Sequence, residues 1–187
     1  ASDVYKRQIS NKARIIRNLI EGAQFLHSHI LWFYTLAALD YVNPLNALKA
    51  NVGSAYDLVE AAGTSCQSDL KALQERLTKF AENGQLSIFS GNWWKNGQSD
   101  TEFKLPAELD LIATAHYIEA LTMQSKASEV CALLGGKMPH VMTIVPGGTS
   151  FVPTEEKLDD LWSLVHELRD WIKATIIPDT KAIAPYY

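Results

Sequence analysis

The sequence predicts a mainly α-helical protein, built as a bundle of long helices with short strand and loop segments between them. Three observations support this fold class. Apolar residues recur at three- and four-residue intervals over residues 10–39, 106–134 and 155–177. Glycine and proline, which end helices, stand at the borders of these stretches. Hydrophobic residues make up 47% of the 187-residue chain, which is enough apolar material for the core of one domain.

The first long helix is expected from Ser10 to Leu39. In its second half the polar face disappears, so we expect that half to be surrounded by protein. The predicted buried stripe of this helix consists of Ile15, Leu19, Ala23, Leu26, Ile30, Phe33 and Ala37.

Two shorter helices are expected next, and each has a capping signal. Ser54 can cap a helix over residues 55–62, which Gly63 ends. Ser68 can cap a second helix over residues 69–82, with leucines at regular helical spacing.

The segment 84–100 is rich in Gly, Asn and Trp and has no helical period, so a loop with one short strand around Leu86–Phe89 is expected. Pro106 suits the first position of the long helix that runs to Leu134. Residues 141–145 can form another short strand.

The last predicted helix begins after Thr154, whose hydroxyl can cap it, and ends at Pro178. Two glutamates in its first turn are placed favourably at the positive end of the helix dipole.

Composition excludes several classes of function. The net charge of −4 gives no basic face, so nucleic acid is not an expected partner. The longest apolar run, Ile30–Leu39, is half of the roughly 20 residues that a membrane span needs, so any membrane association should be indirect. Cys66 and Cys131 are far apart and outside any C-x-x-C pair, which favours two small buried residues over a disulfide framework or a thiolate metal site.

The histidines carry no metal motif. His27 and His29 are two residues apart on a helix and point in nearly opposite directions, so they cannot grip one metal. A hydrogen-bonded core pair is the favoured interpretation, and the alternative is that they line a site built by other segments. His116 is interpreted as a packing residue and His166 as a solvated or packing residue.

The hexapeptide "GGKMPH" is the most distinctive polar feature. Gly135 and Gly136 allow the backbone to leave the helix with a positive φ. Pro139 fixes φ and removes a donor, so Lys137 and His140 should stand on a stiff turn. The residues alone leave two alternatives open, an ordinary helix cap and a functional turn.

Four segments together resemble the middle of the large subunit of nickel–iron hydrogenases: Arg14–Ala50, Gly84–Phe89, Leu105–Leu121 and Gly135–His140. Their order and spacing match from about Ile9 to Tyr187. Residues 1–8 do not look like the family and are expected to be a non-native or misread extension. Residues 9–187 would then form a single helical domain, a fragment of a longer catalytic subunit.

The resemblance implies an enzyme that oxidises or produces hydrogen, an oxidoreductase that works as a heterodimer. In this family a nickel and an iron with cyanide and carbonyl ligands are held by four cysteines in two C-x-x-C pairs, and electrons leave through iron–sulfur clusters of a small subunit. Neither cysteine pair is present here. They are expected before Ile9 and after Tyr187, so no catalytic residue and no metal ligand is assigned within the chain, and the fragment alone should be inactive.

Two groups of residues are carried over from the family. Lys137, Pro139 and His140 match a G-G-K-x-P-H turn that faces the small subunit near the cluster closest to nickel. His27 and His29 match the outer positions of an H-D-H-x-x-H motif, whose aspartate lies behind the metal ligands. Here Ser28 replaces that aspartate and Trp32 replaces the third histidine.

Two other interpretations remain. One is the homologous nickel-free subunit of respiratory NADH:quinone oxidoreductase, and the other is a non-enzymatic helical interaction domain. The intact K-x-P-H turn and the H-x-H pair favour hydrogenase. The periplasmic side of the membrane is expected for a respiratory uptake enzyme, and the cytoplasm otherwise.

Overall fold

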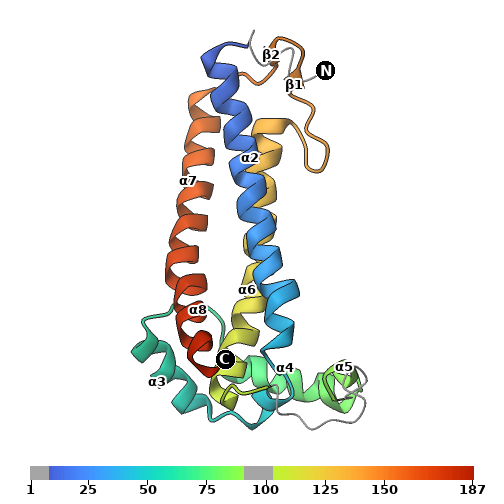
Figure 1. Cartoon of the computed structure of the whole chain (residues 1–187), viewed down its shortest axis with the longest axis vertical. Coiled ribbons are helices and arrows are strands. Elements are labelled where there is room, and N and C mark those ends of the chain that lie inside the picture. The colour runs from blue at the N-terminus through green and yellow to red at the C-terminus, as the bar shows by residue number, and fades with distance from the viewer. Residues whose placement is uncertain (1–8, 91–102) are drawn as a thin grey trace. The chain divides into compact units, whose positions relative to one another are not determined.

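The structure is a computed structural model that describes residues 9–90 and 103–187 (Figure 1). It confirms a mainly helical fold with one short pair of strands. The predicted extension over residues 1–8, and most of the loop predicted over 84–100, lie outside the described residues. The helices and strands are α2 (Asn11–Leu31), α3 (Val52–Ala62), α4 (Leu70–Glu82), α5 (Ser87–Ser90), α6 (Ala107–Gly135), β1 (Ile144–Val145), β2 (Gly148–Thr149), α7 (Glu155–Trp171) and α8 (Ile177–Ile183).

The chain divides into two compact units. The first unit comprises Ala1–Leu31 and Thr122–Arg169, and the second comprises Trp32–Leu121 and Asp170–Tyr187. The long helix α6 therefore contributes its C-terminal half to the first unit and its N-terminal half to the second.

The first unit packs the C-terminal half of α6 against both α2 and α7. The thiol of Cys131 on α6 lies 3.8 Å from the carbonyl oxygen of Ile20 on α2, and Lys126 on α6 forms an ion pair with Glu167 on α7. The strands β1 and β2 form an antiparallel hairpin. The guanidinium of Arg17 on α2 donates to two carbonyl oxygens of this hairpin, at 2.8 and 2.5 Å, and ties it to the helix.

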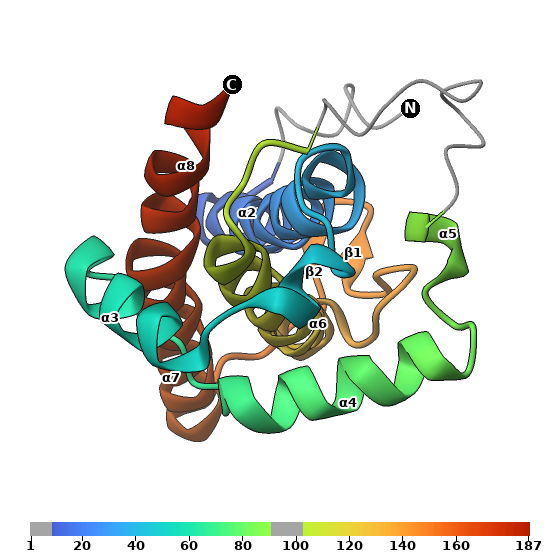
Figure 2. The same cartoon turned by 90° about the horizontal axis from the view of Figure 1, so that it is seen from below.

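The second unit has its main apolar core between α3, α4, the 3₁₀ turn Asn46–Lys49 and the N-terminal half of α6 (Figure 2). Gln74 on α4 closes this core at the turn, because its side-chain amide lies within 2.9–3.3 Å of the carbonyl oxygens of two turn residues and of Ala50, which follows the turn. The buried members of the core are Ala47, Ala50, Ala55, Leu70, Leu73, Leu77, Leu111, Ile112 and Ala115.

The two short helices form as predicted, but other residues cap them. Asn51 precedes α3, and its side-chain oxygen accepts the backbone N–H of Ser54 at 3.1 Å. Asp69 precedes α4 and accepts two backbone N–H groups at 2.9 and 3.0 Å. Ser54 and Ser68 are therefore not the caps. The side chains of Asn51, three residues before Ser54, and of Asp69, directly after Ser68, reach the free N–H groups of the first turn instead. Gly63 ends α3 with φ of 61° in the left-handed region, as predicted.

Three predicted elements differ from the structure. The segment expected as a strand around Leu86–Phe89 is helical, forming α5, and the second expected strand shrinks from residues 141–145 to β1. Pro178 does not end the last helix, because the chain continues through the π-helical turn Ile172–Ile176 into α8. Pro178 is the second residue of α8, near a helix start where a missing N–H costs little.

The buried stripe of α2 agrees with the prediction at Ala23 and Ile30, but in the N-terminal part of the helix it lies on a neighbouring face. Ile15 and Leu19 are 50% and 43% exposed, whereas Ile16 and Ile20 are buried. Each exposed residue of this set stands next to a buried one of similar hydrophobicity, so periodicity alone cannot choose between the two stripes. The continuation of α2, expected to be surrounded by protein, exposes Trp32 and Leu36. None of the described helices is long and apolar enough to cross a membrane.

Asp110 is a buried carboxyl near the start of α6 and is only 1% exposed. Its two oxygens accept hydrogen bonds from the backbone N–H of Asn43 at 2.9 Å and the side-chain amide of Asn46 at 2.8 Å. Burial raises the pKa of Asp110 to about 6, although both hydrogen bonds act in the opposite direction.

We expect Asp110 to make the free energy of unfolding depend on pH. Its pKa is higher in the folded chain than in the unfolded chain, so folding favours the protonated carboxyl. That stabilisation is full below about pH 4 and is lost as the pH rises through about 6. When the pH is lowered from 7.5 to 5, the free energy of unfolding of wild type, measured with urea, should rise by on the order of 1 kcal/mol relative to that of Asp110→Asn. The exposed Asp57→Asn variant should show no such gain, and an equal gain there would contradict the assignment.

Candidate functional site

The turn that follows α6 is closed by hydrogen bonds at its base. The backbone N–H of Met142 donates to the carbonyl oxygen of Gly135 at 2.8 Å, and the hydroxyl of Thr143 donates to that of Leu134 at 2.8 Å. Gly136 has φ of 85°, as expected for the glycine that leaves the helix. The backbone from Gly136 to Val141 is therefore held at both ends.

This turn presents the three residues carried over from the family. Lys137, Pro139 and His140 are all exposed. The bond before Pro139 is cis, and His140 has φ of 65°, in the left-handed region that few residues other than glycine adopt. The geometry fits a surface turn with a defined backbone, and the role of these side chains at an interface stays a prediction.

The second predicted group lies on α2, also in the first unit. His27 is half-buried, and its Nδ1 has no hydrogen-bond partner among the described residues. Ser28 is exposed and accepts a long hydrogen bond of 3.4 Å from the amide of Gln24. His29 is exposed and its Nδ1 lies 2.8 Å from the carbonyl oxygen of Phe25, so the expected pair of core histidines is wrong for His29. No hydrogen bond between described residues joins this group to the turn.

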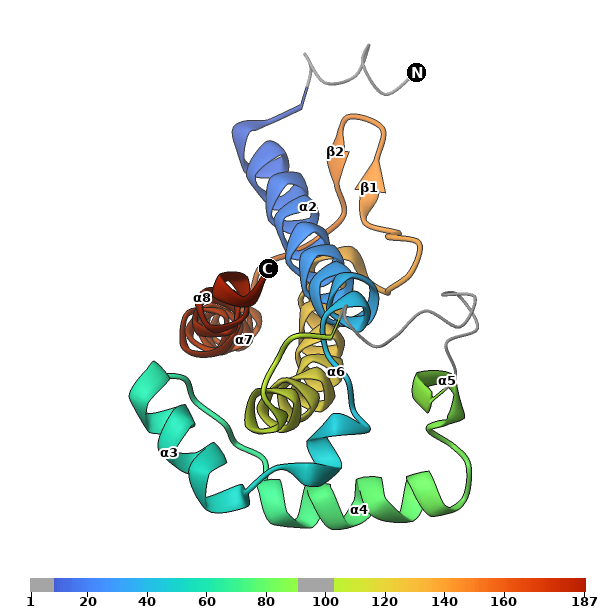
Figure 3. The ribbon, with the colours of Figure 1, turned by 60° about the horizontal axis from the view of Figure 1, so that its bottom comes forward.

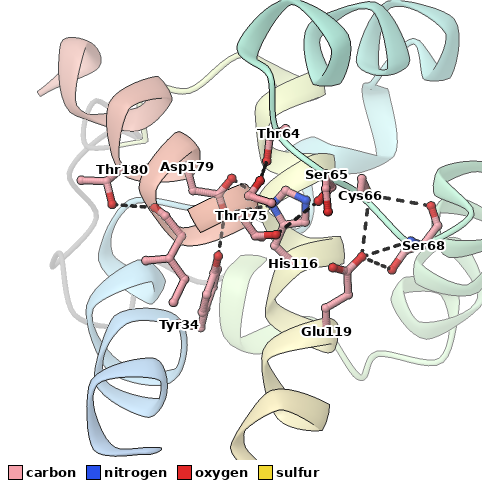
Figure 4. A network of polar contacts seen from close by, with 12 residues as sticks. Tyr34, Thr64, Ser65, Cys66, Ser68, His116, Glu119, Thr175, Asp179 and Thr180 are labelled. Atoms are coloured by element: carbon pink, nitrogen blue, oxygen red, sulfur yellow. Dashed lines mark hydrogen bonds and ion pairs between the residues drawn. The ribbon is translucent and has the colours of Figure 1, made fainter. Parts of the chain in front are cut away.

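A buried polar network in the second unit was not predicted (Figure 4). His116 on α6 is 0% exposed, and its Nδ1 lies 2.9 Å from both carboxylate oxygens of Asp179 on α8. Asp179, 5% exposed, also accepts a hydrogen bond of 2.8 Å from the hydroxyl of Tyr34, in the π-helical turn after α2. Three segments far apart in the sequence thus meet at one carboxylate.

Glu119 extends this network one helical turn further along α6. Its Oε1 accepts the backbone N–H groups of Gln67 at 2.8 Å and Ser68 at 3.0 Å, together with the hydroxyl of Ser68 at 3.0 Å. Its Oε2 accepts the indole N–H of Trp171 at 3.3 Å. The loop between α3 and α4, which carries Cys66, is therefore fastened to α6 by one carboxylate.

The electrostatics of the network follow from burial and from Asp179. Burial lowers the pKa of His116, but the hydrogen bond to Asp179 and the neighbouring Cys66 outweigh it and raise the pKa to about 10. Burial, followed by the charge of Asp179, raises the pKa of Tyr34 far above its ordinary value, so its hydroxyl remains a donor. The raised pKa of His116 favours the protonated imidazole in this network.

The sequence contained a partial signal for this site. His116 and Glu119 are three residues apart on a helix, so they share one face, and they lie in a stretch of α6 that is otherwise almost wholly apolar. Two polar side chains on a buried face need partners. The partner Asp179 is 63 residues away, and no local pattern connects it to His116. The packing interpretation of His116 therefore identified its burial but missed its ion pair.

The comparisons with known proteins agree with the resemblance. Residues 1–187 match the family model described as nickel-dependent hydrogenase. The chain belongs to this family. It is 35% identical to the uptake hydrogenase large subunit of Rhodobacter capsulatus, over 96% of this chain and 32% of that protein. It is 34% identical to the hydrogenase-2 large chain of Escherichia coli strain K12, over 94% of this chain and 32% of that protein.

Solved structures of the family share its fold. The oxidised Ni-Fe-Se hydrogenase of D. vulgaris Hildenborough superimposes with a TM-score of 0.66 at 28% identity, over 96% of this chain and 28% of that chain. The hydrogenase-family chain described here thus spans about a third of the length of the curated relatives it matches.

The cysteines of this hydrogenase-family chain do not fit a nickel–iron centre of four thiolates. Cys66 lies in the second unit and Cys131 in the first. Cys131 is buried and faces the carbonyl oxygen of Ile20, and burial together with the charge of Glu21 raises the pKa of its thiol. Two single thiols on separate elements supply neither C-x-x-C pair of the family.

We expect the stability of the fold to require glycine at position 135, because Val141 packs against it. A Cβ at this position would lie 2.8 and 2.9 Å from the two methyl groups of Val141 and 3.3 Å from its Cβ, so rotation of the valine cannot relieve the clash. Gly135→Ala should lower the free energy of unfolding by about 1–3 kcal/mol, and adding Val141→Ala should restore part of that loss. Gly22→Ala on α2, where nothing lies within 4 Å, is the control and should be neutral or stabilising. Strictly additive effects of Gly135→Ala and Val141→Ala in urea unfolding would contradict the clash.

Proposed function

We propose that this chain is the central part of the large, catalytic subunit of a nickel–iron hydrogenase, which oxidises or produces hydrogen. The observation that carries the proposal is the match of the whole chain to the nickel-dependent hydrogenase family, with relatives named as hydrogenase large subunits at 34–35% identity. The nickel-free homologous subunit of NADH:quinone oxidoreductase and a non-enzymatic interaction domain are less favoured, because these relatives are named as hydrogenases.

The nickel–iron centre, with its cyanide and carbonyl ligands, would be bound by cysteines in parts of the subunit outside this chain. This is consistent with relatives about three times as long. The described residues would form the helical core behind that centre and one surface toward an iron–sulfur small subunit. For an uptake enzyme, we place the complex on the periplasmic side of the membrane, and otherwise in the cytoplasm.

The turn after α6 is the proposed contact with the small subunit. Lys137 and His140 are exposed on a backbone that hydrogen bonds hold at its base. An imidazole N–H at such a position can donate to a cluster sulfur or to a neighbouring carbonyl, and this kind of hydrogen bond changes the reduction potential of an iron–sulfur cluster. A cation such as Lys137 favours approach of an acidic partner surface.

His140→Ala in the intact heterodimer tests this proposal. We expect a shifted reduction potential of the nearest cluster or slower electron exit, while nickel content stays normal, because the nickel ligands are expected in parts of the subunit outside this chain. Redox titration followed by EPR, with hydrogen-dependent dye reduction, measures both. Met142→Ala, an exposed change on the same turn, is the matched control and should behave as wild type. An intact subunit that contains this sequence but binds no nickel and turns over no hydrogen would overturn the proposed function itself.

Ser28 is the proposed position behind the metal site where this chain departs from the family. It is exposed on α2, where its hydroxyl accepts a long hydrogen bond from the amide of Gln24. An aspartate could therefore replace it without disturbing buried packing. Serine is neutral, whereas the family's aspartate carries a charge. Where the rest of the intact subunit shields this position from water, one added charge can move a neighbour's pKa by more than a unit, or about 1.4 kcal/mol.

Ser28→Asp in the intact enzyme should change turnover or inhibitor sensitivity several-fold at unchanged metal content. Ser28→Ala separates the charge from the loss of the hydroxyl. Asn18→Asp introduces the same charge at another exposed position of α2 and serves as the control. Activity assays across pH and oxygen level decide the result. If both Ser28 variants match the parent in rate and pH profile, the residue lies outside the functional region.

A further inference from the structure

Three different ligand atoms converge beside the buried network of the second unit. The Sγ of Cys66, a ring nitrogen of His116 and a carboxylate oxygen of Glu119 lie within 4.8 Å of one another (Figure 4). Cys66 comes from the loop between α3 and α4, and the other two come from one face of α6.

The decisive atom is Nε2 of His116. It is buried, and no hydrogen-bond partner for it exists among the described residues. A buried polar atom left without a partner costs about 1–3 kcal/mol, so it calls for a physical explanation. The opposite nitrogen, Nδ1, is held by Asp179, which is held in turn by Tyr34. A carboxylate that orients one nitrogen of a histidine while the other faces a ligand is the usual support of a metal-binding histidine.

The charges of the cluster also favour a cation. Glu119 and Asp179 are 9% and 5% exposed, and both would be costly to bury as unpaired anions. Within residues 9–90 and 103–187, His116 is the basic side chain that pairs with either of them. A thiolate at Cys66 would add a third negative charge. A divalent ion would offset these charges better than one imidazolium.

We propose that Cys66, His116 and Glu119 form a binding site for a divalent metal ion of the zinc type, through Sγ, Nε2 and a carboxylate oxygen. Sulfur, imidazole nitrogen and carboxylate oxygen are the donors that zinc takes, and three protein ligands leave a fourth position open. Binding releases the protons of the Cys66 thiol and of Nε2 to solvent, and the metal takes their place. The site contains one thiolate, so it differs from a nickel–iron centre held by four.

Oε1 of Glu119 already accepts three hydrogen bonds and would share these with the ion, whereas Oε2 accepts one long hydrogen bond from the indole of Trp171. Sγ of Cys66 lies 3.9 Å from Oε1 of Glu119. Tetrahedral zinc bonds to sulfur and oxygen would place these atoms about 3.6 Å apart. The loop is already fixed, since Oε1 of Glu119 accepts two of its backbone N–H groups, and the N–H of Ser65 donates to the carbonyl oxygen of Ala174 at 2.8 Å. The thiol of Cys66 has long contacts to the carbonyl oxygen of Ser68 at 3.7 Å and to Oε1 of Glu119 at 3.9 Å, and it also interacts with the ring of His116.

Zinc K-edge X-ray absorption on the full chain tests the site. The protein is purified with any subunit that accompanies it, reduced, equilibrated with Zn²⁺ and freed of excess metal. We expect one zinc per chain, with one sulfur neighbour at about 2.3 Å and nitrogen or oxygen neighbours at about 2.0–2.2 Å. The edge is specific for zinc, so nickel and iron elsewhere in the protein do not interfere.

The two cysteines provide matched variants. Cys66→Ser should lose the sulfur neighbour and bind zinc more weakly, whereas Cys131→Ser should retain both the sulfur neighbour and the affinity. Asp179→Asn keeps all three ligands but removes the support of His116, and it should weaken zinc binding about 10–100-fold in competition with a chromogenic chelator. Circular dichroism establishes that each variant keeps the helical content of wild type.

Three outcomes would overturn the proposal. The first is a wild-type protein that holds no stoichiometric zinc. The second is bound zinc without a sulfur neighbour. This result is obtained with wild type, so it tests the site even if the variants fail to fold. The third is loss of the sulfur neighbour in Cys131→Ser instead of Cys66→Ser. The experiment involves no hydrogen turnover, so its failure is distinct from a failure of the proposed hydrogenase function.

Discussion

The pair formed by His116 and Asp179 is the interaction on which the second unit depends. It is nearly inaccessible to solvent, and it joins α6 to α8 across 63 positions of sequence. Through Tyr34 the same carboxylate also fixes the turn that follows α2. Figure 3 shows the ribbons of α6 and α8, the helices that carry the pair. Removing one member of a buried pair leaves the other charge without compensation, which typically costs about 3–5 kcal/mol. Replacing either His116 or Asp179 alone should therefore lower the free energy of unfolding.

Helix α6 serves the second unit as a source of acceptors as well as of apolar surface. Asp110 and Glu119 both project from its buried stretch toward segments without regular structure. Asp110 accepts the backbone N–H of Asn43, and Glu119 accepts those of Gln67 and Ser68. Backbone groups in buried loops need partners as much as those in helices do. The two carboxylates supply these partners while apolar neighbours on the same helix pack the core.

Local patterns predicted the long helices and the turn after α6, because helical periodicity and the Gly135-Gly136 pair are properties of neighbouring residues. The same reasoning could not place the buried stripe of α2, since Ile15-Ile16 offers two apolar faces at once. It also predicted that the last helix ends at Pro178, whereas α8 begins one residue earlier, at Ile177, and includes this proline. Local patterns could not predict the network around His116, for a different reason. Its partners lie on segments whose meeting depends on tertiary packing, and periodicity does not encode which helices meet.

The way in which Glu119 holds its loop has a consequence for sequence variation. Glu119 accepts two main-chain N–H groups, at Gln67 and Ser68, and every residue except proline provides such a group. The hydroxyl of Ser68 donates to the same oxygen, so the side chain at position 67 is free to vary among homologous proteins, whereas position 68 keeps a hydroxyl. A side chain shorter than that of glutamate would release both N–H groups together. Homologous sequences should therefore vary at position 67 and be restricted at position 68 and at the carboxylate on α6.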